Sequence, residues 1–166
     1  LFLGRQPRKP ATSALLALMR TDHERVVPFD ALPPDFICRD WLDESRAARR
    51  WLRLRARAGR LLARQPEAAM LHDHRRLAAW RLRRGLELLS QARVVVTDRL
   101  HAHILCLLLD IPHVALDNHY GKLARFARQW SGRYRGFHKA GSTTDAVAIA
   151  RRILSERTND LHAIAK

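Results

Sequence analysis

Short apolar segments bounded by polar residues recur along the chain and predict buried strands. The clearest are residues 15–19, 93–97 and 113–116, and the second of these is rich in β-branched valine. Their length favours strands over helices. Residues 25–29 and 135–138 are weaker candidates of the same kind. We therefore expect several short strands spread over both halves of the chain.

Apolar residues return at helical spacing in five other segments, which are residues 43–65, 67–91, 99–109, 122–130 and 143–155. The first two, separated by Pro66, predict a helical hairpin with an arginine-rich outer face. Asp98 stands where it would cap the third helix. Strands and helices that alternate in this way predict an α/β fold, with a Rossmann-like parallel sheet and flanking helices.

The composition restricts the class of protein. With 166 residues, 47% of them hydrophobic and 28% charged, the chain suits one globular domain with a real core. Two cysteines exclude a disulfide framework, and the longest apolar run, residues 104–109, is far shorter than the roughly 20 residues of a membrane span. The chain opens with leucine and without the pattern of a signal peptide, so we expect a fragment of a longer protein.

The charge is strongly basic and concentrated in one region. The net charge is +15, and 27 of the 31 basic residues are arginine. Residues 46–93 hold 14 arginines and three acidic residues. Such a surface attracts phosphates, nucleic acids or anionic lipid. A solvated arginine face in the product of a GC-rich gene is the simpler interpretation.

Polar residues follow two of the predicted strands. Residues 20–24 follow the first and residues 97–103 follow the second, and each segment contains an arginine. Ligands of open parallel sheets bind beyond the carboxyl ends of the strands, beside helix N-termini. Two arginines, His101 and a helix N-terminus suit a small, highly charged anion.

Other kinds of site find little support. His101 and His103 are two apart on a predicted helix and do not share a face, so we expect no metal site. His103, between Ala102 and Ile104, is better explained as a packed core histidine. No glycine-rich phosphate loop follows a strand, and a dinucleotide fingerprint is therefore absent.

One long motif and one short motif are the most specific features of the sequence. The long motif comprises residues 94–105 (VVVTDRLHAHIL), 109–118 (LDIPHVALDN) and 120–122 (YGK), and the short one is residues 20–24 (RTDHE). Together they resemble the signature of the polysaccharide pyruvyl transferase family, most closely its members acting on bacterial exopolysaccharides. The resemblance covers residues 14–155. Ala102 departs from it, because many relatives carry glycine there.

The resemblance implies a fold and a reaction. The fold is two Rossmann-like halves, similar to two-lobed GT-B glycosyltransferases, in which residues 1–166 would be a single C-terminal donor-binding domain without its N-terminal half. The reaction is transfer of the enolpyruvyl unit of phosphoenolpyruvate to two hydroxyls of a saccharide. A cyclic pyruvate ketal forms and phosphate is released.

The resemblance also implies the residues of the site. Arg99, Leu100 and His101 would bind the donor, with Arg20 as a second anion-binding arginine. We expect Arg99 and His101 to act in catalysis, with His101 moving a proton. Phosphoenolpyruvate is then a co-substrate, and we expect no cofactor. Three further residues could contact the acceptor or shape its loop: Asn118, Tyr120 and Lys122.

Two other functions fit parts of the sequence. A nucleotide-sugar glycosyltransferase would share the two-lobed architecture, but the triplet of residues 99–101 argues against it. A nucleic-acid-binding module would use residues 46–93 and leave the motifs without a role. We therefore expect a saccharide partner, which could be lipid-linked, and no nucleic acid. The enzyme would be cytoplasmic and could contact the inner face of the membrane peripherally.

Overall fold

The computed structural model describes residues 10–21, 32–41, 50–51, 54–58, 66–117 and 121–164. Contacts divide the chain into two compact units. One consists of residues 1–41 and 86–166, which we call the sheet unit, and the other of residues 42–85, which we call the helical unit. Both polar strand-end segments of the sequence belong to the sheet unit.

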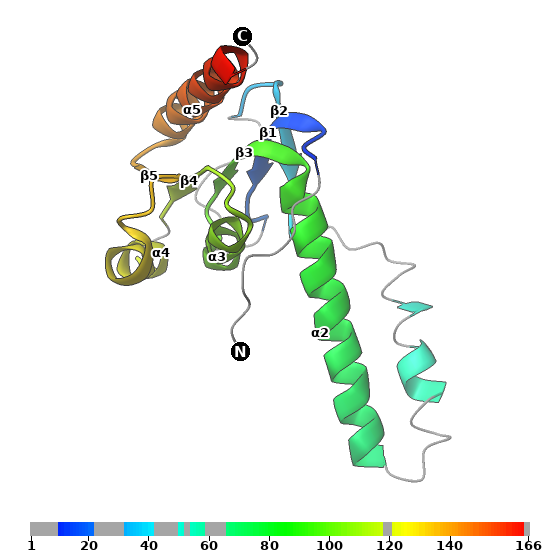
Figure 1. Ribbon diagram of the computed structural model, residues 1–166. Helices are drawn as coiled ribbons and strands as arrows, with labels where there is room; N and C mark the ends of the chain where they lie inside the picture. The colour runs from blue at the N-terminus through cyan, green and yellow to red at the C-terminus, as the bar shows by residue number, and fades with distance from the viewer. Residues whose placement is uncertain are drawn as a thin grey trace. The chain divides into compact units, whose positions relative to one another are not determined.

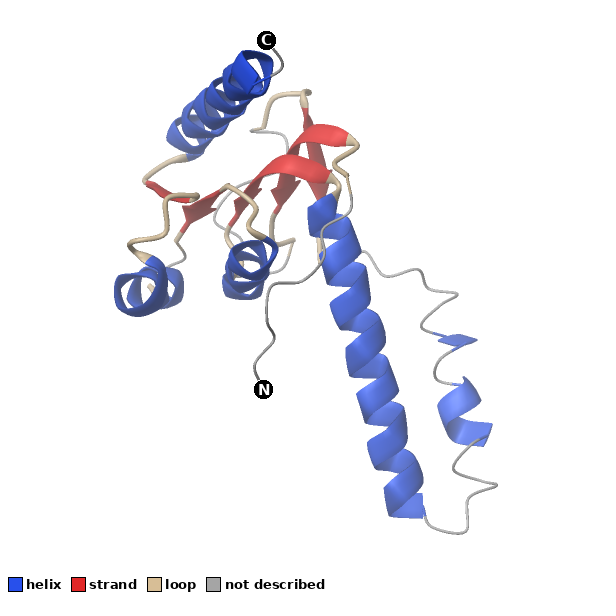
Figure 2. Cartoon of the chain, viewed as in Figure 1, coloured by secondary structure: helices blue, strands red, loops and turns tan. Residues whose placement is uncertain are grey.

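The sheet unit contains a five-stranded parallel sheet in the order β2-β1-β3-β4-β5 (Figures 1 and 2). The strands are β1 (Ser13–Leu18), β2 (Phe36–Arg39), β3 (Ala92–Thr97), β4 (His113–Leu116) and β5 (Phe137–Ala140). The register aligns Leu18 of β1 with Arg39 of β2 and with Thr97 of β3. The carboxyl ends of these three strands therefore lie side by side.

The predicted strands at β1, β3 and β4 are confirmed, and β5 lies two residues later than predicted. β2 was not predicted, because its apolar run ends after three residues at Arg39 and the strand is only partly buried. The candidate strand at residues 25–29 lies outside the described residues.

The helices also follow the predicted pattern. They are α2 (Pro66–Ser90), α3 (Leu100–Leu109), α4 (Lys122–Phe126), the π-helical turn η2 (Ala127–Ser131) and α5 (Thr143–Ile164). The helix predicted for residues 122–130 is thus divided between α4 and η2, and α5 is longer than predicted. Residues 50–51 and 54–58 are helical, and the rest of the predicted helix at 43–65 lies outside the described residues.

Helices cover both faces of the sheet. α5 packs on one face, against β3, β4 and β5, and α3, with α4 beside it, lies on the other (Figure 1). Alternate strand residues point toward α5 and form one hydrophobic core with it. This core contains Leu15, Ala17, Met19, Phe36, Val94, Val96, Val114, Leu116, Ala140, Ala146, Val147, Ala150 and Ile153. Burial on both faces explains why β1 and β3 are apolar almost throughout.

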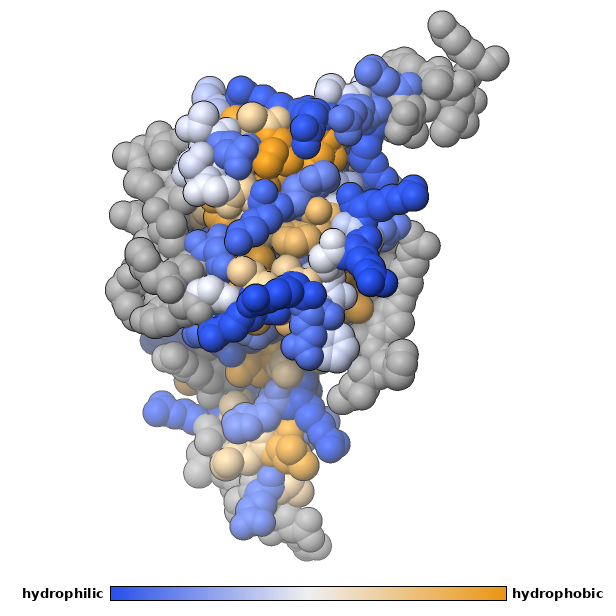
Figure 3. Space-filling model, turned by 90° about the vertical axis from the view of Figure 1, so that its left-hand side faces the viewer, coloured by the Kyte–Doolittle hydropathy of each residue, from blue (hydrophilic) through white to orange (hydrophobic). Residues whose placement is uncertain are grey.

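The outer edge of the sheet at β5 is partly polar. Lys139 is exposed on β5, and a charged residue on an edge strand discourages pairing with another sheet. On the side shown in Figure 3, hydrophilic residues surround small hydrophobic patches.

The helical unit exposes both apolar and basic side chains. Trp51 and Leu54 are each 56% exposed, and the guanidinium of Arg55 lies 5.2 Å from the centre of the Trp51 ring. Arginines of both helical segments are exposed, as predicted for a basic outer face.

The parallel sheet with helices on both faces is an α/β, Rossmann-like fold, as predicted from the sequence. The similarity to the C-terminal half of a GT-B enzyme stays a prediction.

Candidate functional site

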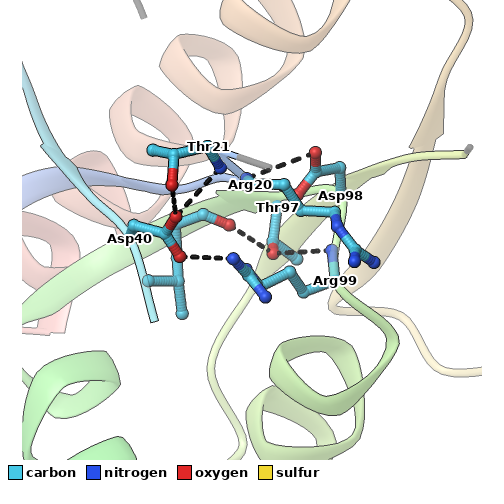
Figure 4. A network of polar contacts seen from close by, with 7 residues as sticks. Arg20, Thr21, Asp40, Thr97, Asp98 and Arg99 are labelled. Carbon is cyan, nitrogen blue, oxygen red and sulfur yellow. Dashed lines mark hydrogen bonds and ion pairs between the residues drawn. The ribbon is translucent and has the colours of Figure 1, made fainter. Parts of the chain in front are cut away.

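Polar residues from three neighbouring strands meet at the carboxyl edge of the sheet. Arg20 and Thr21 follow β1, Asp40 follows β2, and Asp98 and Arg99 follow β3 (Figure 4). Parallel strands bring their carboxyl ends to one edge, so residues far apart in the sequence become neighbours here.

Thr97, the last residue of β3, ties two of these strand ends together. Its hydroxyl donates a hydrogen bond of 2.7 Å to the carbonyl oxygen of Leu18, and accepts one of 3.1 Å from the backbone N–H of Arg99. Thr97 is fully buried. It therefore fixes the turn that leads from β3 into α3.

Asp98 bonds to β1 rather than to the helix that follows it. Its carboxylate accepts hydrogen bonds of 3.1 and 3.4 Å from the backbone N–H of Arg20. The residue at the N-cap of α3 is Arg99, and no side chain caps that end. The prediction that Asp98 caps α3 is wrong, because its side chain is already engaged by the neighbouring strand.

Asp98 is 2% exposed, and burial raises its pKa from the ordinary 3.8 to about 6. The Arg20 N–H and the charge of Arg99 oppose this shift but do not cancel it. A carboxyl group with such a pKa at a strand end marks a candidate functional site.

Asp40, which the sequence interpretation did not single out, connects the ends of β1 and β3. It accepts hydrogen bonds from the Thr21 hydroxyl and, at 2.9 Å, from the Thr21 backbone N–H. Its other carboxylate oxygen forms an ion pair with the guanidinium of Arg99. The only signal in the sequence was an acidic residue directly after the short apolar run of β2.

The segments that carry the two predicted anion-binding arginines lie side by side, as their places after β1 and β3 imply. The side chain of Arg99 is 13% exposed, and its Nε is buried with no hydrogen-bond partner among the described residues. Arg20 is partly buried. An unsatisfied buried donor costs about 1–3 kcal/mol, which is unusual outside functional sites.

The N-terminus of α3 lies at the same edge. Leu100 is partly buried and His101 is exposed in the first turn of the helix. The first backbone N–H groups of a helix lack partners within it, and they favour anions. His101 is thus placed where it could meet a ligand.

His103 is buried on the opposite side of α3 from His101, which confirms that it is a core histidine. His103 Nε2 lies 2.8 Å from the Ser131 hydroxyl, and His103 Nδ1 lies 2.7 Å from His113 Nε2. His113 Nδ1 lies 2.9 Å from the Ile111 carbonyl oxygen. Because a carbonyl only accepts, His113 carries its proton on Nδ1, His103 donates to His113, and Ser131 donates to His103.

This chain of bonds satisfies both rings in their neutral form. Burial lowers the pKa of His103 and of His113 from 6.5 to about 4, and the nearby His138 adds to the effect on His113. The pair links α3, β4 and η2 beneath the sheet and belongs to the framework of the fold.

The residues predicted to contact the acceptor are only partly described. Lys122 is exposed at the start of α4, whereas Asn118 and Tyr120 lie outside the described residues. Within the described ranges, no group of three or more His, Cys, Asp or Glu side chains could hold a metal ion.

The fold and the site together define an α/β domain in which two arginines and a helix N-terminus lie at the carboxyl ends of neighbouring strands. Residues 42–120 match the model of the polysaccharide pyruvyl transferase family. A stretch of 66 residues is 44% identical to Pyruvyl transferase 1 of Schizosaccharomyces pombe, and it covers 39% of this chain and 14% of that protein. The two matches support a polysaccharide pyruvyl transferase family member, and the family match confirms the resemblance seen in the sequence over residues 42–120.

The family and the name of this relative indicate a transferase, and the chain spans a small part of that relative's length. Among the helices that the structure describes, none is both long enough and apolar enough to cross a membrane.

Proposed function

We propose that the carboxyl edge of the sheet unit binds phosphoenolpyruvate, and that the whole enzyme transfers its enolpyruvyl unit to two hydroxyls of a saccharide. The family match supports pyruvyl transfer. The observation that carries the donor assignment is the meeting of Arg20, Arg99 and the N-terminus of α3 at one edge.

The chemistry of the donor fits this edge. Phosphoenolpyruvate carries a carboxylate and a phosphate on adjacent positions of a three-carbon unit. A guanidinium binds either group through two parallel hydrogen bonds, and helix N-terminal amides bind phosphate oxygens. Arg20 and Arg99 would each take one anionic group, and the amides of α3 would share the phosphate.

The reaction needs two proton transfers. Addition of the first sugar hydroxyl to C2 of phosphoenolpyruvate forms a C–O bond and places a proton on the methylene carbon, which becomes a methyl group. The second hydroxyl then displaces the phosphate from C2, and its proton leaves with the phosphate. The products are the cyclic ketal and inorganic phosphate.

His101 is our candidate for one of these transfers. It is exposed, lies within one turn of the proposed donor site and belongs to the long motif. A histidine titrates near neutral pH and can contribute about 10²- to 10⁴-fold to a rate as an acid or base.

The acceptor is a saccharide, which could be lipid-linked, and Asn118, Tyr120 and Lys122 stay candidates for contacts with it. A bacterial exopolysaccharide, a cytoplasmic location and a peripheral membrane contact likewise stay predictions. The matched relative comes from a yeast.

Calorimetric titration of the chain with phosphoenolpyruvate tests the donor assignment. Loss of a charged hydrogen-bonding group costs about 1.5–3 kcal/mol, so Arg99→Ala should weaken binding about tenfold to a hundredfold. Arg93→Ala is the matched control, because Arg93 lies near the amino end of β3, at the other end of the strand from Arg99.

Saturable binding that is lost in Arg99→Ala and kept in Arg93→Ala supports the proposal. Equal affinity in all three proteins refutes it. Tighter binding of a nucleoside diphosphate than of phosphoenolpyruvate would favour a glycosyltransferase. In the intact enzyme, near-full turnover of His101→Ala would exclude His101 from proton transfer.

A further inference from the structure

Asp40 holds the side chain of Arg99 in the loop between β3 and α3. Asp40 is 1% exposed, and one of its carboxylate oxygens pairs with Nη2 of Arg99. The other oxygen accepts the backbone N–H and the hydroxyl of Thr21, next to Arg20. One buried carboxylate thus fixes both segments that carry the proposed donor-binding arginines (Figure 4).

We propose that Asp40 is a positioning residue for the donor site, acting through Arg99 and through the backbone at Thr21. This inference rests on the proposed function. An arginine side chain loses considerable rotamer freedom when it binds a ligand. The fold has already restricted that freedom, so the donor meets a guanidinium that is held in place.

The bond to Asp40 leaves part of the guanidinium available. Asp40 engages Nη2, and the side chain of Arg99 keeps 13% of its surface exposed. A guanidinium has five N–H donors in a planar fork. The same Arg99 can therefore be held by Asp40 on one side and bind an anionic oxygen on another.

Orientation and charge predict opposite effects for the neutral variant Asp40→Asn. On charge alone, removal of a carboxylate beside the site should strengthen the binding of an anion. The donor would lie about 7 Å from Asp40, across the guanidinium, and at the effective dielectric constant of about 20 that suits a buried carboxylate the gain is about fiftyfold. Loss of the charged hydrogen bonds from a well-placed Arg99 weakens binding about tenfold or more. The two effects are separated by the Arg99→Ala background, in which the charge effect remains and the effect through Arg99 is absent.

The experiment compares phosphoenolpyruvate affinity in the chain and in four variants. Asp40→Asn and Arg99→Ala are tested singly and together. Asp35→Asn is the matched control, since Asp35 stands just before β2, is exposed and pairs with Arg151, and its replacement makes the same change in net charge. Thermal unfolding of each protein separates affinity from stability.

We expect Asp40→Asn to change the affinity for phosphoenolpyruvate at least fivefold less favourably in the unmodified background than in the Arg99→Ala background, because only the unmodified background contains the guanidinium that Asp40 holds. Asp35→Asn should bind phosphoenolpyruvate as the unmodified chain does. A merely structural Asp40 would lower the unfolding temperature and change the affinity by the same factor in both backgrounds, which would overturn the inference.

The proposed function and this inference fail in different ways. If the unmodified chain shows no saturable binding, the donor assignment fails and the inference fails with it. If the chain binds and Asp40→Asn changes the affinity by the same factor in the unmodified and the Arg99→Ala backgrounds, only the inference fails.

Should Asp40→Asn not fold, Thr21→Val replaces it, because it keeps both buried charges and removes only the hydroxyl that bonds to Asp40. We expect its affinity to fall about twofold to tenfold. Unchanged affinity in Thr21→Val would overturn the part of the inference that runs through the Thr21 hydroxyl.

Discussion

Three buried groups of the sheet unit make the free energy of unfolding depend on pH between 4 and 6.5. Burial lowers the pKa of His103 and of His113 from 6.5 to about 4. Burial raises the pKa of Asp98 from 3.8 to about 6. All three side chains are at most 2% exposed.

The histidines and Asp98 act in opposite directions as the pH falls. Between pH 6.5 and 4 the unfolded chain binds a proton on each histidine and the folded chain does not, so the stability they contribute above pH 6.5 is lost. Protonation of His113 at Nε2 would also place two N–H donors face to face. Between pH 6 and 3.8 the folded chain binds a proton on Asp98 before the unfolded chain does, so stability rises.

The size of the effect follows from proton linkage. One proton bound differently in the two states changes the free energy of unfolding by about 1.4 kcal/mol per pH unit. Between pH 6 and 4 the contribution of Asp98 to the pH dependence of the free energy of unfolding offsets that of one of the two histidines. In Asp98→Asn this offset is gone, so the stability of the variant should fall more steeply than that of the unmodified chain, by about 1.4 kcal/mol per pH unit.

Urea unfolding at half-unit steps from pH 7 to 4 measures this difference. Unfolding is followed by pulsed hydrogen–deuterium exchange on peptides from β3 and β4. The measured unfolding signal then comes from the sheet unit alone. Ile104→Val is the control, because Ile104 lies on the same helix as His103 and carries no titratable group, so its curve should run parallel to that of the unmodified chain. Parallel curves for Asp98→Asn and the unmodified chain would show that the pKa of Asp98 is not raised, and would refute the reasoning.

Three further changes test the packing of the sheet unit, each by urea unfolding. Ile153→Ala in α5 should cost about 2–5 kcal/mol, because Ile153 is 6% exposed in the core, and a smaller loss would mean that α5 packs loosely. Tyr134→Phe should cost about 1–3 kcal/mol through loss of the 2.6 Å hydrogen bond to Asp110, and unchanged stability would exclude that bond. Gly121→Ala should cost about 1–2 kcal/mol because Gly121 has a φ of 61°, although there is space for a methyl group; a neutral result would contradict this backbone conformation.

Much of the sheet could be predicted from short apolar runs. β1, β3 and β4 are buried on both faces, and burial of that kind requires apolar residues at nearly every position. β2 was not recognised in the sequence. Its residues Ile37 and Arg39 are exposed, so the strand does not require a long apolar run. An edge strand makes weaker demands on its sequence than a central one.

The sequence by itself determined the α/β class, the strand ends that carry Arg20 and Arg99, and the core place of His103. These properties depend on local periodicity, chain length and the order of elements, which are all written along the chain. Only the tertiary structure decided that Asp40 pairs with Arg99, 59 residues away, and that Asp98 bonds to the Arg20 amide rather than capping α3. The reason is that strand order and register bring these groups together, and a buried carboxylate takes the donor that its neighbouring strand provides.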